Sequence, residues 1–583
     1  MTAPAPLGES RDTTVAPLEA LPLSETAAPP YLLGFRRALY RGAGFSRDEV
    51  RRPLIGVANS WGEINPATRH LNVVSNRVKA GITAAGGTPV EFVLSGLCDG
   101  TCAAAPGYNR YNLPWRDIAV SYLEAVARAN MFDGMVFVGV CDEVVPAHLL
   151  AAVRLDLPSI LVLGGAMEPG RRPPGADGAA AGGDEVWAGD MTPAFAGMLD
   201  GSVSEADYLA LEDVACGGAG ACPVMGTANT MHVFAEACGL TLPGNAVVPG
   251  AGLELEDLAY AAGLRAVELV QADLRPSAVL TQAALENAVR AVVAAGGSTC
   301  AVLHVLALSA EAGLTLGLDD FDRLSRSTPL LVDVRPSGRH LATDFHRAGG
   351  VSGLLANLAP LLHLEARMVT GETLGDRLAA VPPPDPAVIR PLTDPLASEG
   401  GMAVLRGSLA PEGAVFKQSG STVRRFEGPA RVFETEEAAG EAILCGEVVG
   451  GEVLVVRSCG PVGAPGMPCL YGSLWLLKSR GLDDRVALVT DGRLSGTIRG
   501  LAVAHVSPES GVGGPLAAVR DGDAILIDVD ARRLDLLVDV AEVARRLAAD
   551  PPTLSPAPGG ALAAYRALVG PTHRGAVQEV PGG

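Results

Sequence analysis

The sequence predicts an α/β fold, with an N-terminal α/β layer domain that has a largely parallel sheet and a C-terminal β-barrel-like domain. Between residues 31 and 380, apolar strand-like runs alternate with segments of helical periodicity, which is typical of a parallel sheet covered by helices. Between residues 391 and 570, short β-branched segments are bounded by glycine, which indicates a β-rich domain. The proline-rich segment 381–390 is therefore predicted to be a stiff linker between the two domains.

The two ends of the chain differ from these domains. Residues 1–30 are rich in Ala, Pro, Ser, Thr and Glu and hold few large apolar side chains. Such a segment buries too little apolar surface to offset the entropy lost on ordering, so we expect it to be disordered. It also lacks the basic start and the apolar centre of a secretory signal. Residues 571–583 are assigned to a C-terminal tail.

The first elements of the N-terminal domain are a strand and a helix. The strand begins at Leu54 and runs into a polar turn. The helix is predicted from apolar residues at helical spacing, namely Leu71, Val74, Val78 and Ile82. A second strand-like run follows, and the chain then reaches Cys98 and Asp99, so that a thiol and a carboxylate close this strand.

The next strand is predicted from the uninterrupted apolar run 135–140, which is typical of a strand buried on both faces of a parallel sheet. Cys141, Asp142 and Glu143 follow at its carboxyl end, where open α/β sheets bind ligands. Soft and hard metal ligands are adjacent there. The alternative is a buried cysteine before a helix whose dipole favours the two carboxylates.

A third cysteine, Cys222, lies in a glycine-rich loop that leads into a predicted helix. In the C-terminal domain, short strands are predicted in the segments Ala430–Phe433, Glu452–Arg457, Val486–Val489 and Ala524–Val529.

Composition narrows the class of protein. The chain has 45 basic and 65 acidic residues, and a net charge of −20 argues against non-specific binding to nucleic acid. Its apolar runs are far shorter than the ~18 residues that span a bilayer. Ten cysteines in 583 residues do not form a disulfide scaffold, and their clustering indicates metal binding or catalysis. We therefore expect a soluble, cytoplasmic protein.

Several ordered motifs resemble one known family. They are GVANSWGEINPATRHL, CDG, FDGMVFVGVCD, GAGACPVMGTANTM, LTLPGNA, LDDFDRLSRSTPLLVDVRPSGRH, PGMP and TDGRLSG followed by HVSPES. They resemble the dihydroxy-acid dehydratase and phosphogluconate dehydratase family, which includes the sugar-acid dehydratases. The resemblance runs from about residue 31 to about residue 570. It implies an iron–sulfur cluster held by three cysteines, a magnesium ion, and loss of water from a 2,3-dihydroxy acid to give a 2-keto acid. It also implies a homodimer or a dimer of dimers.

The resemblance assigns cluster ligands residue by residue. Cys141 and Cys222 match the second and third cluster cysteines. The first should follow Asn-Pro, where this chain has Ala67, and a methyl group cannot bind iron. If a cluster is assembled, its third ligand must come from elsewhere, and the candidates are Cys98, Cys300 and Cys469.

The implied magnesium site is also altered. Asp99 and Asp142 match metal-binding aspartates, and Glu143 stands where the family has a lysine that is carbamylated to become a ligand. Together the three carboxylates are enough to hold a magnesium ion that keeps several waters. Three further family positions have become thiols, at Cys300, Cys459 and Cys469.

The implied catalytic base is Ser495, which lies in the motif Asp-Gly-Arg-Leu-Ser-Gly. In the family the serine alkoxide removes the proton from C2. A serine can act so only if a nearby cation lowers its high pKa. The alternative is that Ser495 simply caps a turn after the strand at 486–489.

Two functions from different classes follow from these residues. One is a dehydratase-like lyase that acts on a small hydroxy acid in a specialised pathway, with Ser495 as base and an altered metal centre. The other is a non-catalytic paralogue that is retained as a binding or scaffolding protein. The substitutions at Ala67 and Cys469 favour the second function or a changed chemistry. The retained polar set favours the first, and it consists of Asp99, Cys141, Asp142, Cys222 and Ser495.

Overall fold

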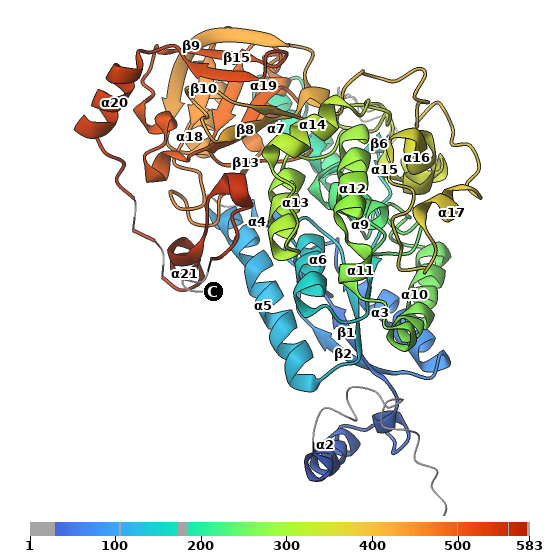
Figure 1. Cartoon of the computed structure of the whole chain (residues 1–583). Coiled ribbons are helices and arrows are strands. Elements are labelled where there is room, and N and C mark those ends of the chain that lie inside the picture. The colour runs from blue at the N-terminus through green and yellow to red at the C-terminus, as the bar shows by residue number, and fades with distance from the viewer. Residues whose placement is uncertain are drawn as a thin grey trace, which may run out of the picture.

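The computed structural model describes residues 29–103, 107–172, 185–497, 499–554, 556–557 and 559–579. Residues 1–28, which make up nearly all of the segment 1–30 predicted to be disordered, lie outside these ranges. Figure 1 shows two large bodies side by side, one rich in helices and one built around a second sheet, with helix α2 (Pro30–Gly42) below them. No helix in the described ranges is long and apolar enough to cross a membrane.

A four-stranded parallel sheet lies at the centre of the N-terminal body, as predicted. Its order is β2-β1-β3-β4. The strands are β1 (Leu54–Asn59), β2 (Thr88–Val93), β3 (Gly134–Gly139) and β4 (Ser159–Leu163). Every residue of β1, β3 and β4 is buried, which explains why their sequences read as continuous apolar runs.

Helices cover both faces of this sheet. The connection from β1 to β2 runs toward one edge of the sheet, and the connection from β2 to β3 runs back past β1 toward the other edge. Because both crossovers are right-handed, their helices lie on opposite faces of the sheet. The helix pair α3 (Leu71–Ala84) and α10 (Leu253–Ala272) covers one face, and the pair α5 (Asn112–Asn130) and α6 (Val144–Leu155) covers the other. α6 is buried along most of its length, because a further helical layer packs over it.

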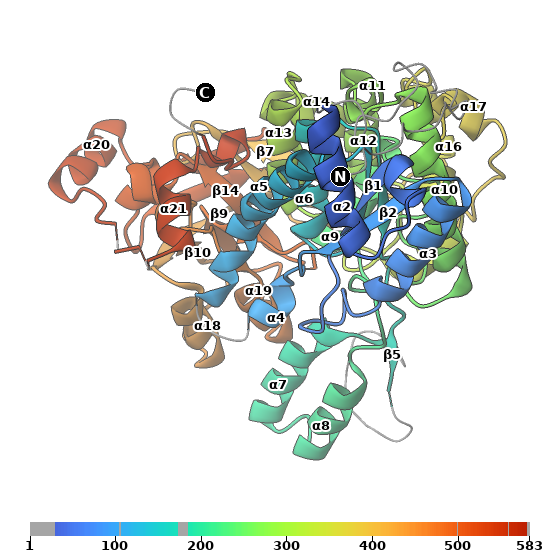
Figure 2. The same cartoon turned by 90° about the horizontal axis from the view of Figure 1, so that it is seen from below.

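That further layer completes the N-terminal body. Its helices are α9 (Thr227–Ala237), α11 (Pro276–Val279), α12 (Gln282–Ala294), α13 (Cys300–Glu311), α14 (Leu318–Arg326), α15 (Ala342–Arg347), α16 (Gly350–Leu358) and α17 (Leu374–Leu378). One hydrophobic cluster joins these helices to the sheet, so they form a single core. Figure 2 shows a smaller protrusion formed by α7 (Met191–Asp200) and α8 (Glu205–Val214). It packs through α7 against α19 (Gly472–Ser479) of the C-terminal body.

An eight-stranded mixed sheet forms the C-terminal body, in the order β16-β15-β9-β10-β12-β14-β8-β7. The strands are β7 (Ala403–Leu405), β8 (Gly413–Phe416), β9 (Arg425–Phe433), β10 (Val453–Val456), β12 (Ala487–Thr490), β14 (Leu501–Ser507), β15 (Ala524–Asp528) and β16 (Arg533–Leu536). A bridge between Arg406 and Arg533 links the two ends of the sheet and nearly closes it. The predicted barrel-like domain is therefore confirmed.

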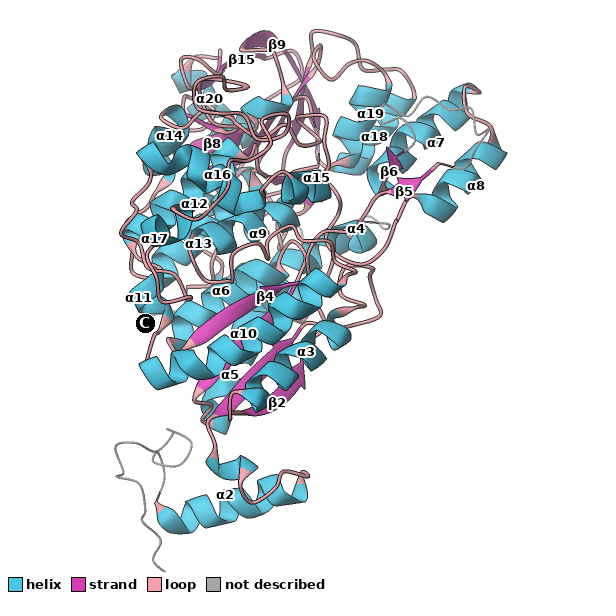
Figure 3. Cartoon of the chain, turned by 90° about the vertical axis from the view of Figure 1, so that its right-hand side faces the viewer, coloured by secondary structure: helices cyan, strands magenta, loops and turns pink. Residues whose placement is uncertain are grey.

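Two apolar clusters lie on the two faces of this sheet. One contains inward residues such as Val455 and Val489, and the other contains their neighbours Leu454 and Leu488. The second cluster is covered by α18 (Glu436–Leu444) and α19. Figure 3 shows the parallel sheet and the barrel-like sheet at opposite ends of the molecule, with helices between them.

Candidate functional site

The carboxyl edge of the parallel sheet gathers several of the predicted site residues. After β2 the chain reaches Cys98 and then Asp99, the first residue of the short helix α4 (Asp99–Cys102). After β3 it reaches Cys141, Asp142 and Glu143, directly before α6. Cys141 has φ +94°, an uncommon value for a residue with a side chain. Such backbone outliers cluster at functional sites, so this one supports a role for the turn.

Three thiols form a first group at this edge. The thiols of Cys98 and Cys141 lie close enough to affect each other's pKa, and Cys222 interacts electrostatically with both. The contact with Cys141 lowers the pKa of Cys98 to about 7, and the same contact and burial raise the pKa of Cys141. The three cysteines come from three separate loops.

A second group is formed by Cys300 and Cys469. Cys300 begins α13, and its thiol donates to the carbonyl of Leu494 at 3.2 Å. Cys469 lies in the two-residue strand β11 (Cys469–Leu470), which pairs with β13 (Arg493–Leu494). The two thiols interact directly, and this contact, together with His505, lowers the pKa of Cys300. Of the three candidates for the third cluster ligand, Cys98 thus lies in the first thiol group, and Cys300 and Cys469 form the second.

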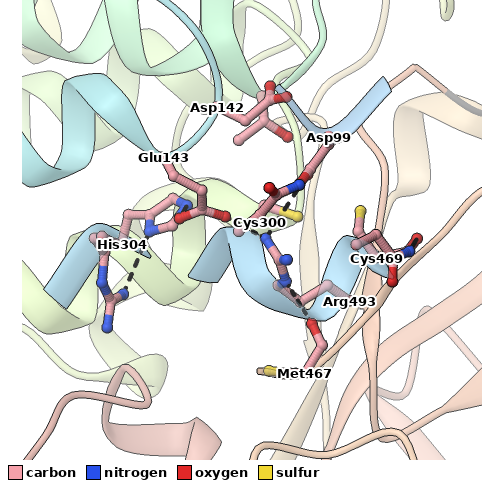
Figure 4. Close-up of polar contacts among 12 residues, drawn as sticks. Asp99, Asp142, Glu143, Cys300, His304, Met467, Cys469 and Arg493 are labelled. Atoms are coloured by element: carbon pink, nitrogen blue, oxygen red, sulfur yellow. Dashed lines mark hydrogen bonds and ion pairs between the residues drawn. The ribbon is translucent and has the colours of Figure 1, made fainter. Parts of the chain in front are cut away.

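Arg493 forms a buried ion-pair network with two of the predicted metal ligands. Its side chain is wholly buried, its Nη1 is bonded to Glu143, and the same atom lies 3.8 Å from Asp99. Its Nε donates to the carbonyl of Met467 at 2.8 Å. Figure 4 shows the arginine reaching toward both carboxylates. Burial opposes the charge on Arg493, but Glu143 and Asp99 outweigh it and raise its pKa, so this guanidinium is charged.

A second arginine extends the network on the side of Glu143. His304 Nε2 lies 3.6 Å from Glu143, and His304 Nδ1 lies 3.5 Å from Nη1 of Arg116. Burial and the two arginines lower the pKa of His304 well below its usual value, so the imidazole is neutral. Arg116 is itself paired with Asp117 and with the carbonyl of Ala576.

The arrangement of the carboxylates does not fit the magnesium ion that the resemblance implies. Glu143 and Asp99 share Arg493, and Asp99 also accepts a hydrogen bond from Asn112. Asp142 turns toward α9, where its Oδ1 accepts from the backbone N–H of Ala228 at 2.9 Å. Within the described residues, no three His, Cys, Asp or Glu side chains are placed to hold a single metal ion. The guanidinium of Arg493 lies between Glu143 and Asp99, where a magnesium ion would have to bind.

An iron–sulfur cluster fits the first thiol group better. Cluster irons are bound by cysteine thiolates, and a cluster several atoms wide does not require its ligands to meet at one point. Ala67, at the altered family position, is buried in the core that also contains Cys141.

Ser495 enters the site from the C-terminal body. Its hydroxyl is 2.8 Å from the hydroxyl of Thr497, and it accepts from the backbone N–H of Thr497 at 3.3 Å. The loop packs against the N-terminal body, because a Cβ placed on Gly496 would lie 2.4 Å from Cβ of Ser298. Gly226, just before α9, is in similar contact with the methyl group of Thr497. The serine therefore does cap a turn, and this turn lies where the two domains meet.

Cys459, the remaining altered position, lies away from both thiol groups. It is buried, its thiol donates to the carbonyl of Arg457 at 3.4 Å, and it lines a cavity of about 660 Å³ between the domains. Arg110 from the N-terminal body and Glu436 from the C-terminal body line the same cavity. Cys459 is thus separated from the carboxylates and the thiols described above.

Sequence reasoning missed two cationic side chains that belong to the site, Arg493 and Lys417. Arg493 lies in the Asp-Gly-Arg-Leu-Ser-Gly motif, two residues before Ser495, and its place in this motif could have identified it as a site residue. Lys417 is 4% exposed and donates through Nζ to the carbonyl of Gly496 at 2.6 Å. It is one of three lysines in the chain and directly follows the apolar run of β8. A lysine at the end of a buried strand points to a site less specifically than a motif does.

Comparisons with known proteins agree with the motifs. The family model for the dihydroxy-acid/6-phosphogluconate dehydratase N-terminal domain matches residues 52–377, and the model for the C-terminal domain matches residues 387–576. The chain is 43% identical over 544 residues to a dihydroxy-acid dehydratase of Pyrococcus abyssi, covering 93% of this chain and 97% of that protein. It is 44% identical over 549 residues to one of Ignicoccus hospitalis, with the same coverage. The chain belongs to the dihydroxy-acid/6-phosphogluconate dehydratase family.

Proposed function

We propose that the protein is a hydro-lyase that removes water from a small 2,3-dihydroxy acid and releases a 2-keto acid. The observation that carries this proposal is that the loop of Ser495, from the C-terminal body, packs on Ser298 and Gly226 of the N-terminal body, and Asp142 of the sheet edge is bonded two residues further on, at Ala228. The relatives are named dihydroxy-acid dehydratases and match over nearly their whole length, which supports the same class of reaction. The comparisons with known proteins give no support to the alternative of a non-catalytic scaffold.

The proposed reaction balances without an oxidant. The alkoxide of Ser495 takes the proton from C2 as the C2–H bond breaks, and that electron pair forms the double bond between C2 and C3. The hydroxyl on C3 leaves as hydroxide and takes the proton back from Ser495, so that water is formed and the alkoxide is restored. The enol then rearranges to the 2-keto acid. No step is assigned to magnesium, because the carboxylates do not fit that ion here.

We propose that Cys98, Cys141 and Cys222 hold an iron–sulfur cluster, with Cys98 in place of the missing ligand at Ala67. The support is the contact between the first two thiols and the nearness of the third. The three side chains would bind the irons as thiolates, and the cluster would supply Lewis acidity toward the hydroxyl that leaves from C3.

A substrate screen tests the reaction. The protein, purified without air, is incubated with a series of 2,3-dihydroxy acids, and the 2-keto acid is measured as its hydrazone. We expect turnover by the wild type and a loss of about 10³-fold in Ser495→Ala, because general base catalysis contributes on this scale. Ser479→Ala, whose hydroxyl bonds only within α19, is the control. No turnover of any acid by the wild type, or full activity in Ser495→Ala, would refute the proposal.

Iron and sulfide analysis with the visible absorption spectrum tests the cluster ligands independently of activity. Cys98→Ser should lose iron, sulfide and the charge-transfer absorption, since serine is a poor ligand for these irons. Cys102→Ser, one helical turn away in α4, and Cys300→Ser, in the second thiol group, should keep all three. A Cys98→Ser protein with a full cluster would exclude the assignment.

We further propose that the protein is cytoplasmic and assembles as a homodimer or a dimer of dimers. All ten cysteines are free thiols, which is the usual state in a reducing compartment. The support for assembly is the outer face of α2, where Tyr31, Phe35 and Leu39 are 75%, 66% and 61% exposed. A contiguous exposed apolar face of this kind marks an interaction site.

A further inference from the structure

Lys417 is a buried cation without a carboxylate partner. It lies directly after β8, only 4% of its surface is exposed, and within the described residues no Asp or Glu lies within ion-pair distance of its Nζ. Its one hydrogen bond there goes to the carbonyl of Gly496, at 2.6 Å. A buried charge that is not paired is costly, so such a group is retained where an anion is bound or formed.

The carbonyl that receives this bond belongs to the same peptide unit that contacts Ser495. The peptide between Gly496 and Thr497 accepts from Lys417 through its oxygen and donates through its N–H to Oγ of Ser495. Hydrogen bonds in series polarise one another, so an ammonium on the oxygen makes the N–H a stronger donor. The Thr497 hydroxyl, 2.8 Å from Oγ, adds a second donor to the same atom.

The other cations of the site are already committed. Arg493 is bonded to Glu143 and lies close to Asp99, and Arg116 is paired with Asp117. His304 is neutral. Of the cationic groups described at the site, Lys417 is thus the one without an Asp or Glu partner. The titratable group that acts on its charge is the thiol of Cys300, which favours the protonated amine, and the ammonium also faces the loop of Ser495 through Gly496.

We propose that Lys417, acting through the Gly496–Thr497 peptide, stabilises the alkoxide of Ser495 and so makes this serine a base. Lys417 is therefore a positioning residue, and the Thr497 N–H and hydroxyl are the groups that touch the reacting oxygen. The inference rests on the proposed dehydratase function and deepens it, because it names a protein cation for the charge that a serine base needs.

The proton balance of the step is simple. The hydroxyl proton of Ser495 leaves to solvent before the first turnover, and the alkoxide that remains is held by two donors and the ammonium behind them. Burial lowers the pKa of Lys417 to about 7. A negative charge on Ser495 favours the protonated amine, so the ammonium and the alkoxide stabilise each other. Proton removal from C2 then returns the serine to its neutral form.

The experiment compares Lys417→Met, Lys417→Arg and the exposed control Lys478→Met in two assays. In turnover of a dihydroxy acid, Lys417→Met should lower kcat by about 10²- to 10³-fold, the range for loss of one donor to a catalytic oxyanion, while KM stays close to the wild-type value. The pH at which kcat reaches half its maximum should also rise. Lys417→Arg should recover part of kcat, and Lys478→Met should match the wild type. Wild-type kcat and pH profile in Lys417→Met would overturn the inference.

The second assay does not need the substrate. An aryl sulfonyl fluoride labels an activated serine as a bond forms between Oγ and sulfur and fluoride leaves, and mass spectrometry locates the label. Ser495 should be labelled in the wild type and in Lys478→Met, and labelling in Lys417→Met should fall by a similar factor to kcat. If no acid is turned over but this difference appears, the proposed function fails and the inference stands. Equal labelling of Ser495 in the wild type and in Lys417→Met overturns the inference alone.

Discussion

At the scale of single residues, the strongest feature of the site is a guanidinium enclosed by protein. The Arg493 side chain has no exposed surface, and its charge is balanced by Glu143, which is 1% exposed, and by Asp99. Removing two charges from water costs several kcal/mol per ion, and only close pairing with further hydrogen bonds offsets that cost. The bond from Arg493 to the Met467 carbonyl supplies one of these. The ion pair is therefore stable only while both partners are present.

Glu143→Gln should lower the free energy of unfolding by about 3–5 kcal/mol, because it leaves the charge of Arg493 buried and only partly paired. Urea unfolding monitored by circular dichroism measures this change. The control is Glu427→Gln, whose exposed pair with Arg425 at 4.0 Å contributes little. The double change Glu143→Leu with Arg493→Met should recover much of the loss. A Glu143→Gln protein as stable as the wild type would show that Glu143 is not the partner that balances Arg493.

The site residues that were predicted from the sequence are grouped by the sheet, whereas those that were missed depend on partners far away along the chain. Asp99 follows β2, and Cys141 and Asp142 follow the buried strand β3; parallel strands bring their carboxyl ends to one edge, so this grouping was predictable from the chain alone. The bond between Arg493 and Glu143 joins positions 350 residues apart, and that between Lys417 and Gly496 joins positions 79 residues apart. No local pattern encodes such pairs, because the domains must first be folded and docked.

At the scale of elements, the position of the sheet edge depends on how closely α3 and α10 pack. A Cβ on Gly81 would lie 2.1 Å from the carbonyl oxygen of Tyr260, and one on Gly263 would lie 2.1 Å from that of Val78. The two backbones thus touch where the helices cross. The sequence predicted the apolar stripe of α3 correctly, but it gave no sign that a glycine in each helix sets their separation.

Gly81→Ala should destabilise the N-terminal body by about 1–3 kcal/mol, because the new methyl group meets backbone atoms that cannot move without separating the helices. Thermal unfolding followed by calorimetry checks this. Gly34→Ala in α2 is the matched control, since no atom lies within 4 Å of its added methyl group. That change should raise local helix stability by about 0.5–1 kcal/mol. Equal melting curves for Gly81→Ala and the wild type would mean that the helices are not held at this contact.

At the scale of the whole molecule, the two bodies are joined by the site itself. The loop of Ser495 packs on Ser298, and Arg493 of the C-terminal body is bonded to Glu143 of the N-terminal body. The class of each body was predictable from strand length and periodicity. The barrel-like form of the second sheet was predicted too, but not the pairing of Arg406 with Arg533 that links its two ends.

Among the residues that the structure describes, α2 carries an exposed apolar surface. The helix touches the body through Tyr40, which packs on the core and whose hydroxyl lies 3.4 Å from Asn130 at the end of α5, and through Arg36, which donates to the carbonyl of Asn130. Figures 1 and 3 show it set apart from the sheet and its helices. Its other apolar side chains face away from the body, and burying them against a second copy of the chain would contribute about 25 cal/mol per Å² of apolar area.

The last prediction therefore concerns assembly. The wild type should have at least twice the mass of the 59.5 kDa chain in size-exclusion chromatography with light scattering. The double change Phe35→Ser with Leu39→Ser should shift it toward the monomer, because it removes apolar area from α2 without touching the core. Leu253→Ser, at the start of α10 and 77% exposed, is the control and should assemble like the wild type. A monomeric wild type at micromolar concentration, or a double variant that assembles fully, would show that α2 does not mediate contact between copies.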